Sequence, residues 1–240
     1  MVGHWDGRAH HGRIAGGSIM TGDFPPPVLA WHRGADHDLN HDDKAALVVL
    51  LHGRGSNETD IIALADHLPA GPDYVAVRAP IGEGGGFAWF ANRGIGRPIP
   101  ESLTETMAWF QAWLDEAATA DRPVLLVGFS GGAAFAGGLI LADPSRYAGA
   151  AILSGTLPFD AGLPTTTGRL AGLPVLVAQG DADRVIPRQL LDRTWQYLTG
   201  DSGATTQTSR DPGGHAISPA TLIVLQQWIT KYADTQELGR

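Results

Sequence analysis

Residues 124–142 read VLLVGFSGGAAFAGGLILA and hold the pattern that decides the fold. The apolar run at 124–127 is typical of a buried strand, and the small and apolar residues at 131–142 predict a helix. Between them, residues 128–132 (GFSGG) match G-x-S-x-G. A serine on a sharp turn between a strand and a helix is typical of a nucleophile elbow. We therefore expect Ser130 to be a nucleophile.

The glycines around Ser130 have a physical task in this interpretation. An elbow strains the serine backbone and brings strand and helix close together, so a Cβ at position 128 or 132 would crowd the approach. The alternative is an ordinary glycine turn with an incidental serine, because short patterns arise by chance in a chain with 32 glycines among 240 residues. The strand before the motif and the helix after it favour the elbow.

Strands and helices alternate along the whole chain. This order predicts an α/β protein with a mostly parallel central sheet and helices on both faces. A turn is expected at 34–44 and a long irregular loop, rich in Gly and Pro, at 81–100. Strands are expected at residues 28–32, 45–51, 74–79, 124–127, 147–153, 175–179 and 205–210. Helices are expected at residues 60–68, 101–120, 131–142, 188–198 and 218–232, with Ser218 as the N-cap of the last.

Composition limits the function classes. Apolar residues make up 43% and charged residues 18% of the chain, as in a compact globular protein. The net charge of −8 repels phosphate backbones, so nucleic acid is not expected as a partner. The absence of cysteine excludes disulfides, thiolate nucleophiles and cysteine-based zinc sites. No membrane span or signal peptide is predicted, so we expect a cytoplasmic protein.

The chain divides into two unequal parts. Residues 1–26 are rich in His, Gly and Pro and predict a loosely ordered arm, whereas residues 27–240 are expected to form a single catalytic domain. His4, His10 and His11 could bind a metal ion, but their spacing does not match a ligand set, so a solvated arm and no metal site are expected.

A nucleophile elbow requires an acid and a base, which follow the serine in the order Asp or Glu, then His. His215 is the only histidine after Ser130 and is therefore the expected base. The segment DADRVIP at 181–187 follows a predicted strand and offers two carboxylates. Asp183 is the preferred acid, which would hold the imidazole tautomer, and Asp181, a turn former, stays an alternative.

The sequence HGRG at 52–55 follows the predicted strand at 45–51. In enzymes with this motif, the loop at that place donates one backbone N–H to the oxyanion, and the residue after the nucleophile donates the other. The expected donors are Arg54 and Gly131, and the alternative is a plain turn. His52 is interpreted as a structural hydrogen-bonding residue, because the base is expected near the other end of the chain.

Four segments together carry a family resemblance: LLHGRGSNETD, GFSGG, QGDADRVIP and GGHAIS. They resemble the phospholipase/carboxylesterase family of α/β-hydrolases, small enzymes with little cap that are related to acyl-protein thioesterases. The resemblance covers about residues 45–232 and implies an α/β-hydrolase fold without a large cap domain. It implies the same acid, base and oxyanion donors. Gly131 stands where many thioesterase relatives have Gln, and in this the chain resembles a bacterial carboxylesterase branch.

These observations predict a serine carboxylesterase that hydrolyses short-to-medium-chain esters through an acyl-enzyme. The substrate is a small-molecule ester, and no cofactor is required. Trp89 and Phe90, in the loop after a central strand, are candidate substrate-binding residues, and the alternative is that they are loop core. Leu157 and Ile186, just past two strand ends, are further candidates. The absence of a segment long enough for a lid predicts an open, shallow site.

Two alternatives stay open. The same triad could serve an acyl thioesterase, lysophospholipase or peptidase, because fold does not decide among them. A non-catalytic α/β-hydrolase used as a ligand receptor is a candidate from another class, although it would not need the complete set of Ser, Asp and His. The chain is expected to be a monomer or a homodimer.

Overall fold

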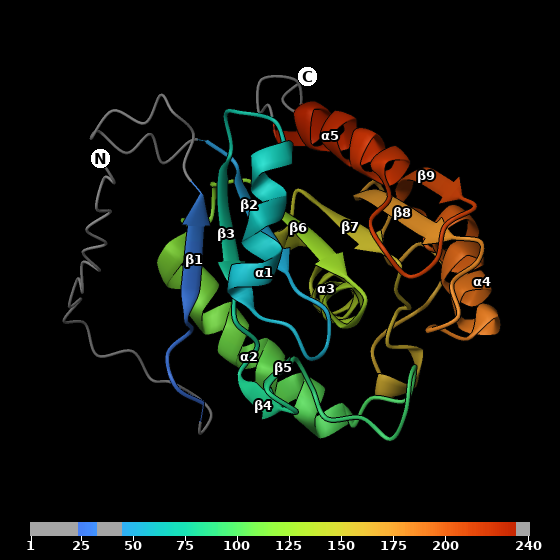
Figure 1. The fold of residues 1–240 in the computed structure, drawn as a ribbon, viewed down its shortest axis with the longest axis horizontal. Helices are drawn as coiled ribbons and strands as arrows, with labels where there is room; N and C mark the ends of the chain where they lie inside the picture. Colours follow the sequence, from blue (N-terminus) through green and yellow to red (C-terminus); the bar gives the residue numbers. More distant parts are fainter. Residues whose placement is uncertain (1–23, 33–44, 234–240) are drawn as a thin grey trace, which may run out of the picture.

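The computed structural model describes residues 24–32 and 45–233, which form a seven-stranded sheet with helices on both faces (Figure 1). The strand order is β1-β3-β2-β6-β7-β8-β9. β1 pairs antiparallel with β3 at one edge, and the other pairs of this sheet are parallel, which confirms the predicted architecture. The strands are β1 (Leu29–His32), β2 (Leu47–Leu51), β3 (Asp73–Val77), β6 (Val124–Phe129), β7 (Gly149–Leu153), β8 (Pro174–Gly180) and β9 (Thr205–Asp211).

Burial on both faces of the sheet explains the continuous apolar runs in the central strands. Every residue of β2, β3 and β7 is buried. Successive side chains of a strand point to opposite faces, and β2 supplies both. Val48 and Leu50 join one hydrophobic cluster. Leu47, Val49 and Leu51 join the other.

Helices cover each of these clusters. α1 and α5 pack on the first face and α2 and α3 on the second (Figure 1). On the second face, Phe110 of α2 meets Phe135 of α3 edge to face, with ring centroids 5.6 Å apart. The arrangement fixes α3, and with it the end of β6, deep inside the molecule. The helices are α1 (Glu58–Ile62), α2 (Pro100–Ala117), α3 (Gly131–Ala142), α4 (Arg188–Gln196) and α5 (Pro219–Ala233).

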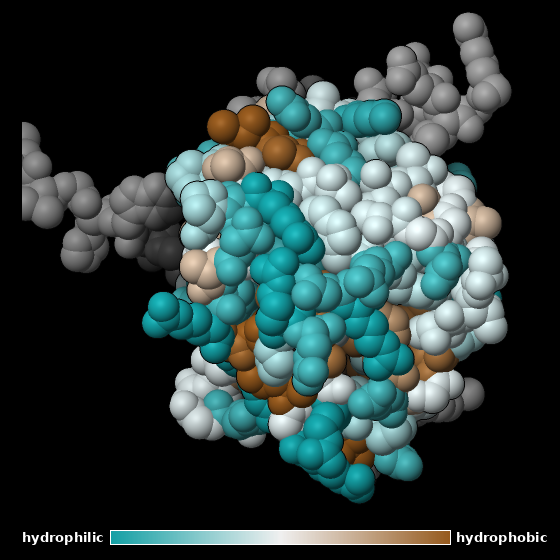
Figure 2. All heavy atoms as spheres, turned by 90° about the vertical axis from the view of Figure 1, so that its right-hand side faces the viewer, coloured by the Kyte–Doolittle hydropathy of each residue, from teal (hydrophilic) through white to brown (hydrophobic). Residues whose placement is uncertain are grey.

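The edge strand β9 is polar along its length. Its sequence is TTQTSRD, and its side chains are half-buried or exposed. Figure 2 looks toward the side of the molecule that carries β9 and α4, where hydrophilic side chains predominate. Polar and charged side chains on an edge strand disfavour pairing with another chain.

The prediction of an irregular loop at 81–100 was wrong in its first part. Residues Ile81–Glu83 (β4) and Gly86–Ala88 (β5) form an antiparallel hairpin. Gly84 and Gly85 make its two-residue turn, with φ of 57° and 86°. Two positive φ angles are what the favoured hairpin turn requires, and glycine adopts them without strain. The Gly run that suggested irregularity is therefore the turn chemistry of a hairpin.

Two predicted helices differ from the expectation in where they begin or end. The segment expected at 60–68 begins earlier, at Glu58, because the Asn57 side chain accepts a hydrogen bond from the Asp60 amide as N-cap. It continues as a 3-10 helix over Ala63–His67 and stops before a proline. α4 ends at Gln196 and continues as a π-helical turn over Tyr197–Asp201. The Ser218 cap of α5 is confirmed by a 3.1 Å bond from the Thr221 amide.

Several predictions fall outside the described residues. They concern the turn at 34–44, nearly all of the arm at 1–26, and the histidines His4, His10 and His11. The division into an arm and a single domain at 27–240 stays a prediction. None of the helices in the part of the chain that the structure describes combines the length and the apolar composition needed to cross a membrane.

Candidate active site

Ser130 lies on a strained turn between β6 and α3. Its φ is 54° and its ψ is −112°, a backbone conformation that residues other than glycine rarely adopt. Such strain persists only where the surroundings enforce it, and it clusters at functional sites. The turn lifts the serine out of the strand, and its side chain lines a pocket at the carboxyl end of the sheet.

Two glycines make this turn sterically possible. A Cβ at Gly132 would lie 2.1 Å from the Leu51 carbonyl oxygen, and a Cβ at Gly128 would lie 2.3 Å from the Gly132 oxygen. Both contacts are with backbone, which cannot rotate away as a side chain can. The expectation that side chains at these two positions would crowd the elbow is confirmed.

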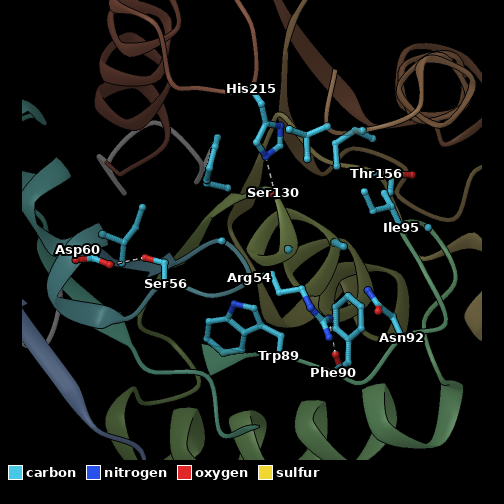
Figure 3. Close-up of a pocket in the computed structure, with 18 residues that line it drawn as sticks. Arg54, Ser56, Asp60, Trp89, Phe90, Asn92, Ile95, Ser130, Thr156 and His215 are labelled. Carbon is cyan, nitrogen blue, oxygen red and sulfur yellow. Dashed lines mark hydrogen bonds between the residues drawn. The ribbon is translucent and has the colours of Figure 1, made fainter. Parts of the chain in front are cut away.

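A relay of hydrogen bonds connects Ser130 to the two residues expected to follow it. His215 Nε2 lies 2.9 Å from Ser130 Oγ (Figure 3), and His215 Nδ1 lies 2.8 Å from Asp183 Oδ2. His215 sits in the loop after β9, and Asp183 in the loop after the neighbouring strand β8. Ser130 and Asp183, which are 85 and 32 residues away from His215 in the sequence, therefore both contact its imidazole.

The Asp183 carboxylate is held from both oxygens. Its Oδ1 accepts hydrogen bonds from the amides of Val185 at 2.8 Å and Ile186 at 3.0 Å, and the side chain has no exposed surface. Burial on its own would raise the pKa of Asp183, but the bonds from His215 and from the two amides outweigh it and lower the pKa. The carboxylate is thus kept ionised next to His215 Nδ1.

Asp181, the alternative acid, has other contacts. Its Oδ1 lies 3.5 Å from Nη1 of Arg188, and both side chains are about half exposed. The pair belongs to the surface, where the attraction between ions is weak. Asp183 therefore contacts His215, whereas Asp181 lies near Arg188 at the N-terminus of α4.

Gly131 lies against the backbone of Arg54. A Cβ at Gly131 would be only 3.1 Å from the Arg54 nitrogen. Gly131 is the first residue of α3, so its amide has no partner within the helix and shares the partial positive charge of the helix N-terminus. That the Arg54 and Gly131 amides hold an oxyanion stays a prediction.

His52 is a structural residue, as expected. It is fully buried, its Nδ1 lies 2.8 Å from the Gly53 carbonyl oxygen, and its Nε2 accepts a 3.1 Å bond from the Ala79 amide. An acceptor Nε2 places the proton on Nδ1, so the ring is neutral. Burial lowers the pKa of His52, which agrees with the neutral form. The ring fastens the start of the 52–55 loop to the end of β3.

A cavity of about 500 Å³ opens in front of Ser130 and His215 (Figure 3). Among the predicted substrate-binding residues, Trp89, Phe90 and Ile186 line it. Trp89 is also core: it is 1% exposed and stacks on Phe135 with ring centroids 4.4 Å apart. Trp89 is therefore part of the core, as the alternative interpretation expected, and it also borders the cavity. Its role in binding substrate stays a prediction.

Leu157 is not brought to the cavity. It is 1% exposed and packs against α3, where a Cβ at Gly137 would lie 2.5 Å from its Cδ2. Its amide donates to Thr194 Oγ1 at 3.1 Å, which ties the segment to α4. The neighbouring Thr156 faces the cavity instead. A position just past a strand end is thus not sufficient to predict a pocket residue.

Several lining residues were not predicted from the sequence. Ile95 stands out, because it is 43% exposed and sits between Gly94 and Gly96, which both have positive φ. An apolar residue flanked by two glycines in a long loop was a usable signal. Opposite it, Ser56 donates to the Asp60 carboxylate at 2.8 Å, on the side away from Ile95 (Figure 3). The unpredicted lining residues are Gly53, Ser56, Asp60, Ile61, Asn92, Ile95, Gly96, Phe129, Ala134, Thr156 and Val185.

The seven-stranded sheet, the strained serine between β6 and α3 and the loops at the carboxyl ends of the strands define an α/β-hydrolase fold. The sequence model of the phospholipase/carboxylesterase family matches residues 39–233, and the chain belongs to that family. This confirms the resemblance seen in the sequence. Within the described residues, no cluster of three or more His, Asp or Glu could hold a metal ion.

Individual relatives agree with the family assignment. The chain is 27% identical to MhqD of Bacillus subtilis (strain 168) over 187 residues, which is 76% of this chain and 91% of MhqD. It is 30% identical to the carboxylesterase SOBER1 of Arabidopsis thaliana over 143 residues, 57% of this chain and 62% of SOBER1.

Two solved carboxylesterases share the fold. The Bacillus cereus enzyme superposes with a TM-score of 0.73 at 22% identity, covering 86% of this chain and 94% of that one. The Mesorhizobium loti enzyme gives 0.69 at 28% identity, covering 77% and 88%. Family and relatives together support hydrolysis of ester bonds as the class of activity.

Proposed function

We propose that this protein is a serine carboxylesterase that hydrolyses short-to-medium-chain carboxylic esters through an acyl-enzyme. The observation that carries the proposal is the hydrogen-bonded relay from Ser130 through His215 to Asp183, placed at the mouth of a cavity in a member of the phospholipase/carboxylesterase family. The three residue types in this order and geometry are those of a nucleophile, a general base and the acid that orients it.

In the first half of the reaction, Ser130 Oγ attacks the ester carbonyl carbon while its proton passes to His215 Nε2. The 2.9 Å distance between these two atoms suits that transfer. Asp183 accepts the Nδ1–H bond, which keeps the unprotonated Nε2 turned toward the serine and stabilises the imidazolium once it forms. The carbonyl oxygen becomes an oxyanion between the amides of Arg54 and Gly131.

Those two amides are fixed before the substrate arrives. The elbow sets the position of the Gly131 amide, and the loop that carries Arg54 is bonded to the β4–β5 hairpin, where the Gly55 amide donates to the Phe87 carbonyl oxygen at 2.9 Å. One such donor contributes roughly 2.7–4 kcal/mol to lowering the barrier in serine hydrolases. The collapse of the oxyanion then expels the alcohol, which takes the proton from His215 Nε2. Water attacks the acyl-enzyme by the same steps in reverse, with His215 as base, and frees the acid.

The cavity supports a preference for substrates of limited size. Its volume of about 500 Å³ lies in the range of small-molecule sites. Apolar side chains of Phe90, Ile95 and Ile186 suit an acyl chain, and the exposed positions of Ile95 and Val185 leave the entrance open. Such a site suits short and medium chains and offers no closed tunnel for long ones.

Hydrolysis of a p-nitrophenyl ester series, acetate to palmitate, by the wild type and Ser130→Ala tests the proposal. The wild type should be most active on the short and medium esters, and Ser130→Ala should lose activity while keeping its melting temperature. A fluorophosphonate probe should label the wild type alone. Equal activity of the two proteins would remove Ser130 as nucleophile, and faster turnover of palmitate than of butyrate would overturn the chain-length proposal. Ratios of kcat/KM for matched ester, thioester and amide substrates separate esterase from thioesterase or peptidase chemistry.

A further inference from the structure

The backbone amide of Arg54 is one of the two that we propose to hold the oxyanion. Arg54 lies between two glycines, which favour a flexible backbone. It is flanked by Gly53 and by Gly55, whose φ is +81°. Glycine has more accessible backbone conformations than any other residue, so a glycine on each side leaves the Arg54 amide poorly fixed by the local chain alone. A donor contributes to catalysis only when its direction is set in advance. Contacts of Arg54 with other parts of the molecule must therefore set it.

The side chain of Arg54 provides such contacts. Its Nε donates to Glu83 Oε1 at 2.7 Å, and its Nη2 donates to Glu83 Oε2, so the guanidinium and the carboxylate form a two-point ion pair. Its Nη1 donates to the carbonyl oxygen of Phe90 at 3.1 Å (Figure 3). A planar guanidinium held at three donors has little freedom to turn, and the bidentate geometry fixes its direction as well as its position.

Glu83 itself stands on a rigid support. It ends β4, whose partner β5 is hydrogen-bonded to the loop that follows Arg54. The Gly55 amide donates to Phe87 O at 2.9 Å, and the Phe87 amide donates to Ser56 O at 3.0 Å. A Cβ at Gly86 would lie 1.9 Å from the Gly55 oxygen, so hairpin and loop are in direct backbone contact. The hairpin thus holds the loop by its backbone behind Arg54 and by Glu83 at the Arg54 side chain.

We propose that Glu83 is a positioning residue for the oxyanion site, acting through the guanidinium of Arg54 to hold the Arg54 amide next to that of Gly131. The inference rests on the proposed esterase mechanism and adds a residue outside the triad and the oxyanion donors. Glu83 does not line the cavity, so it acts without touching the substrate.

The same contacts argue against a different role for Arg54. A guanidinium at the edge of a pocket often binds an anionic substrate group. Here each of its three nitrogens already donates a hydrogen bond, two of them to Glu83 and one to the Phe90 carbonyl oxygen, and the Glu83 carboxylate neutralises its charge. The side chains of Arg54 and Glu83 are 33% and 43% exposed, so the pair contributes little to global stability. Removing Glu83 should therefore change catalysis more than folding.

A double-mutant cycle with Glu83→Ala, Arg54→Met and the double variant tests the proposal, because Arg54→Met removes the guanidinium and keeps the amide. We expect kcat to fall about 5- to 20-fold in each single variant, less than the ~10²–10³-fold for complete loss of an oxyanion donor. The double variant should be no slower than Arg54→Met, and KM should stay within about twofold of the wild-type value if only the transition state is affected. Effects that multiply in the double variant, or a changed KM with normal kcat, would overturn the proposal.

An inhibitor series separates positioning from a general structural effect. A trifluoromethyl ketone adds to Ser130 and forms an oxyanion, whereas the matching methyl ketone binds largely unreacted. Glu83→Ala should weaken the trifluoromethyl ketone by the same factor as kcat/KM and leave the methyl ketone unchanged. Asp160→Asn, which removes a carboxylate 3.7 Å from Arg193 and away from the cavity, is the matched control and should change neither.

Two further measurements keep the result interpretable. Glu83→Gln preserves the shape of the side chain, so it tests the charge if Glu83→Ala folds poorly. Its kcat should lie between those of Glu83→Ala and the wild type. Because the pair is half exposed, 1 M salt should lower kcat of the wild type and not of Arg54→Met. Activity that persists in Ser130→Ala would refute the esterase mechanism itself. Activity that requires Ser130 but is unaffected by Glu83→Ala would refute only the positioning role.

Discussion

Gly180→Ala tests how closely the loop of His215 must lie against the end of β8. A Cβ at position 180 would lie 2.3 Å from the Gly214 oxygen and 2.4 Å from the Gly213 oxygen. Real Cβ atoms essentially never come within 3.0 Å of such atoms. The loop must therefore move outward by at least about 0.7 Å, because both neighbours are backbone and cannot rotate away.

The displacement acts on the residue that follows Gly214. His215 Nε2 is 2.9 Å from Ser130 Oγ, and an added 0.7 Å gives a separation of about 3.6 Å, too long for a hydrogen bond. Misplacement of a reacting group by about 1 Å can cost roughly 10²-fold in rate. We therefore expect kcat to fall about 30- to 100-fold, equivalent to about 2–2.7 kcal/mol of activation free energy.

The assay is steady-state hydrolysis of p-nitrophenyl butyrate, together with the rate of fluorophosphonate labelling and a thermal melt. Both the kcat and the labelling rate of Gly180→Ala should fall, since both depend on removal of the serine proton. Gly200→Ala is the matched control, because a Cβ there meets no atom within 4 Å, and its kcat should equal the wild-type value. A Gly180→Ala variant with wild-type kcat would refute the link between this backbone contact and the catalytic geometry.

Two further predictions concern carboxylates. Asp183→Asn should lower kcat by roughly 10⁴-fold with little change in KM, because an amide cannot hold the required imidazole tautomer, and a loss below 10-fold in the ester assay would count against Asp183 as the acid. Asp211 accepts bonds from Ser218 Oγ at 2.7 Å and from the Gly213 amide at 2.7 Å, and these lower its pKa in the folded state. The stabilisation is therefore complete above the unfolded pKa of about 3.9 and is lost as pH falls through the lower folded value. Asp211→Asn should cost about 1.5 kcal/mol near pH 7, or roughly 3–6 °C in Tm, and the difference from wild type should shrink below about pH 4; a gap independent of pH would contradict the linkage.

The relay could be predicted from the sequence because each member directly follows a parallel strand. Ser130 follows β6, Asp183 follows β8 and His215 follows β9. In a parallel sheet these carboxyl ends lie along one edge, so residues that follow different strands can lie close together in space although they are far apart in the sequence. The sequence preferred Asp183 over Asp181, and the structure shows that Asp183 is the one that contacts the imidazole. Backbone direction at that turn decides which one reaches the imidazole.

The walls of the cavity were less accessible to sequence reasoning. Trp89, Phe90 and Ile186 do line it, whereas Leu157 turns toward α3. Whether a loop residue faces a cavity depends on backbone φ and ψ angles, which local sequence patterns do not predict. Ile95 shows the difficulty, since glycines with positive φ on both sides direct it toward the site. The hairpin β4–β5 and the ion pair of Glu83 with Arg54 escaped prediction for the same reason, because residues 29 apart in sequence meet only once the hairpin has formed.

Backbone contacts at glycines set the geometry of this site as much as its polar groups do. A Cβ at Gly132 would meet the Leu51 oxygen, one at Gly180 the Gly214 oxygen, and one at Gly155 the Ser130 oxygen at 2.8 Å. The first contact joins the turn after β6 to the end of β2, the second joins the end of β8 to the loop that carries His215, and the third joins the ends of β7 and β6. Packed backbone is less deformable than side chains, so each contact limits where the nucleophile, the oxyanion donors and the base can move. In the proposed mechanism, glycine at these positions therefore matters for catalysis, because it lets the backbone segments that carry Ser130, Arg54 and His215 approach one another closely.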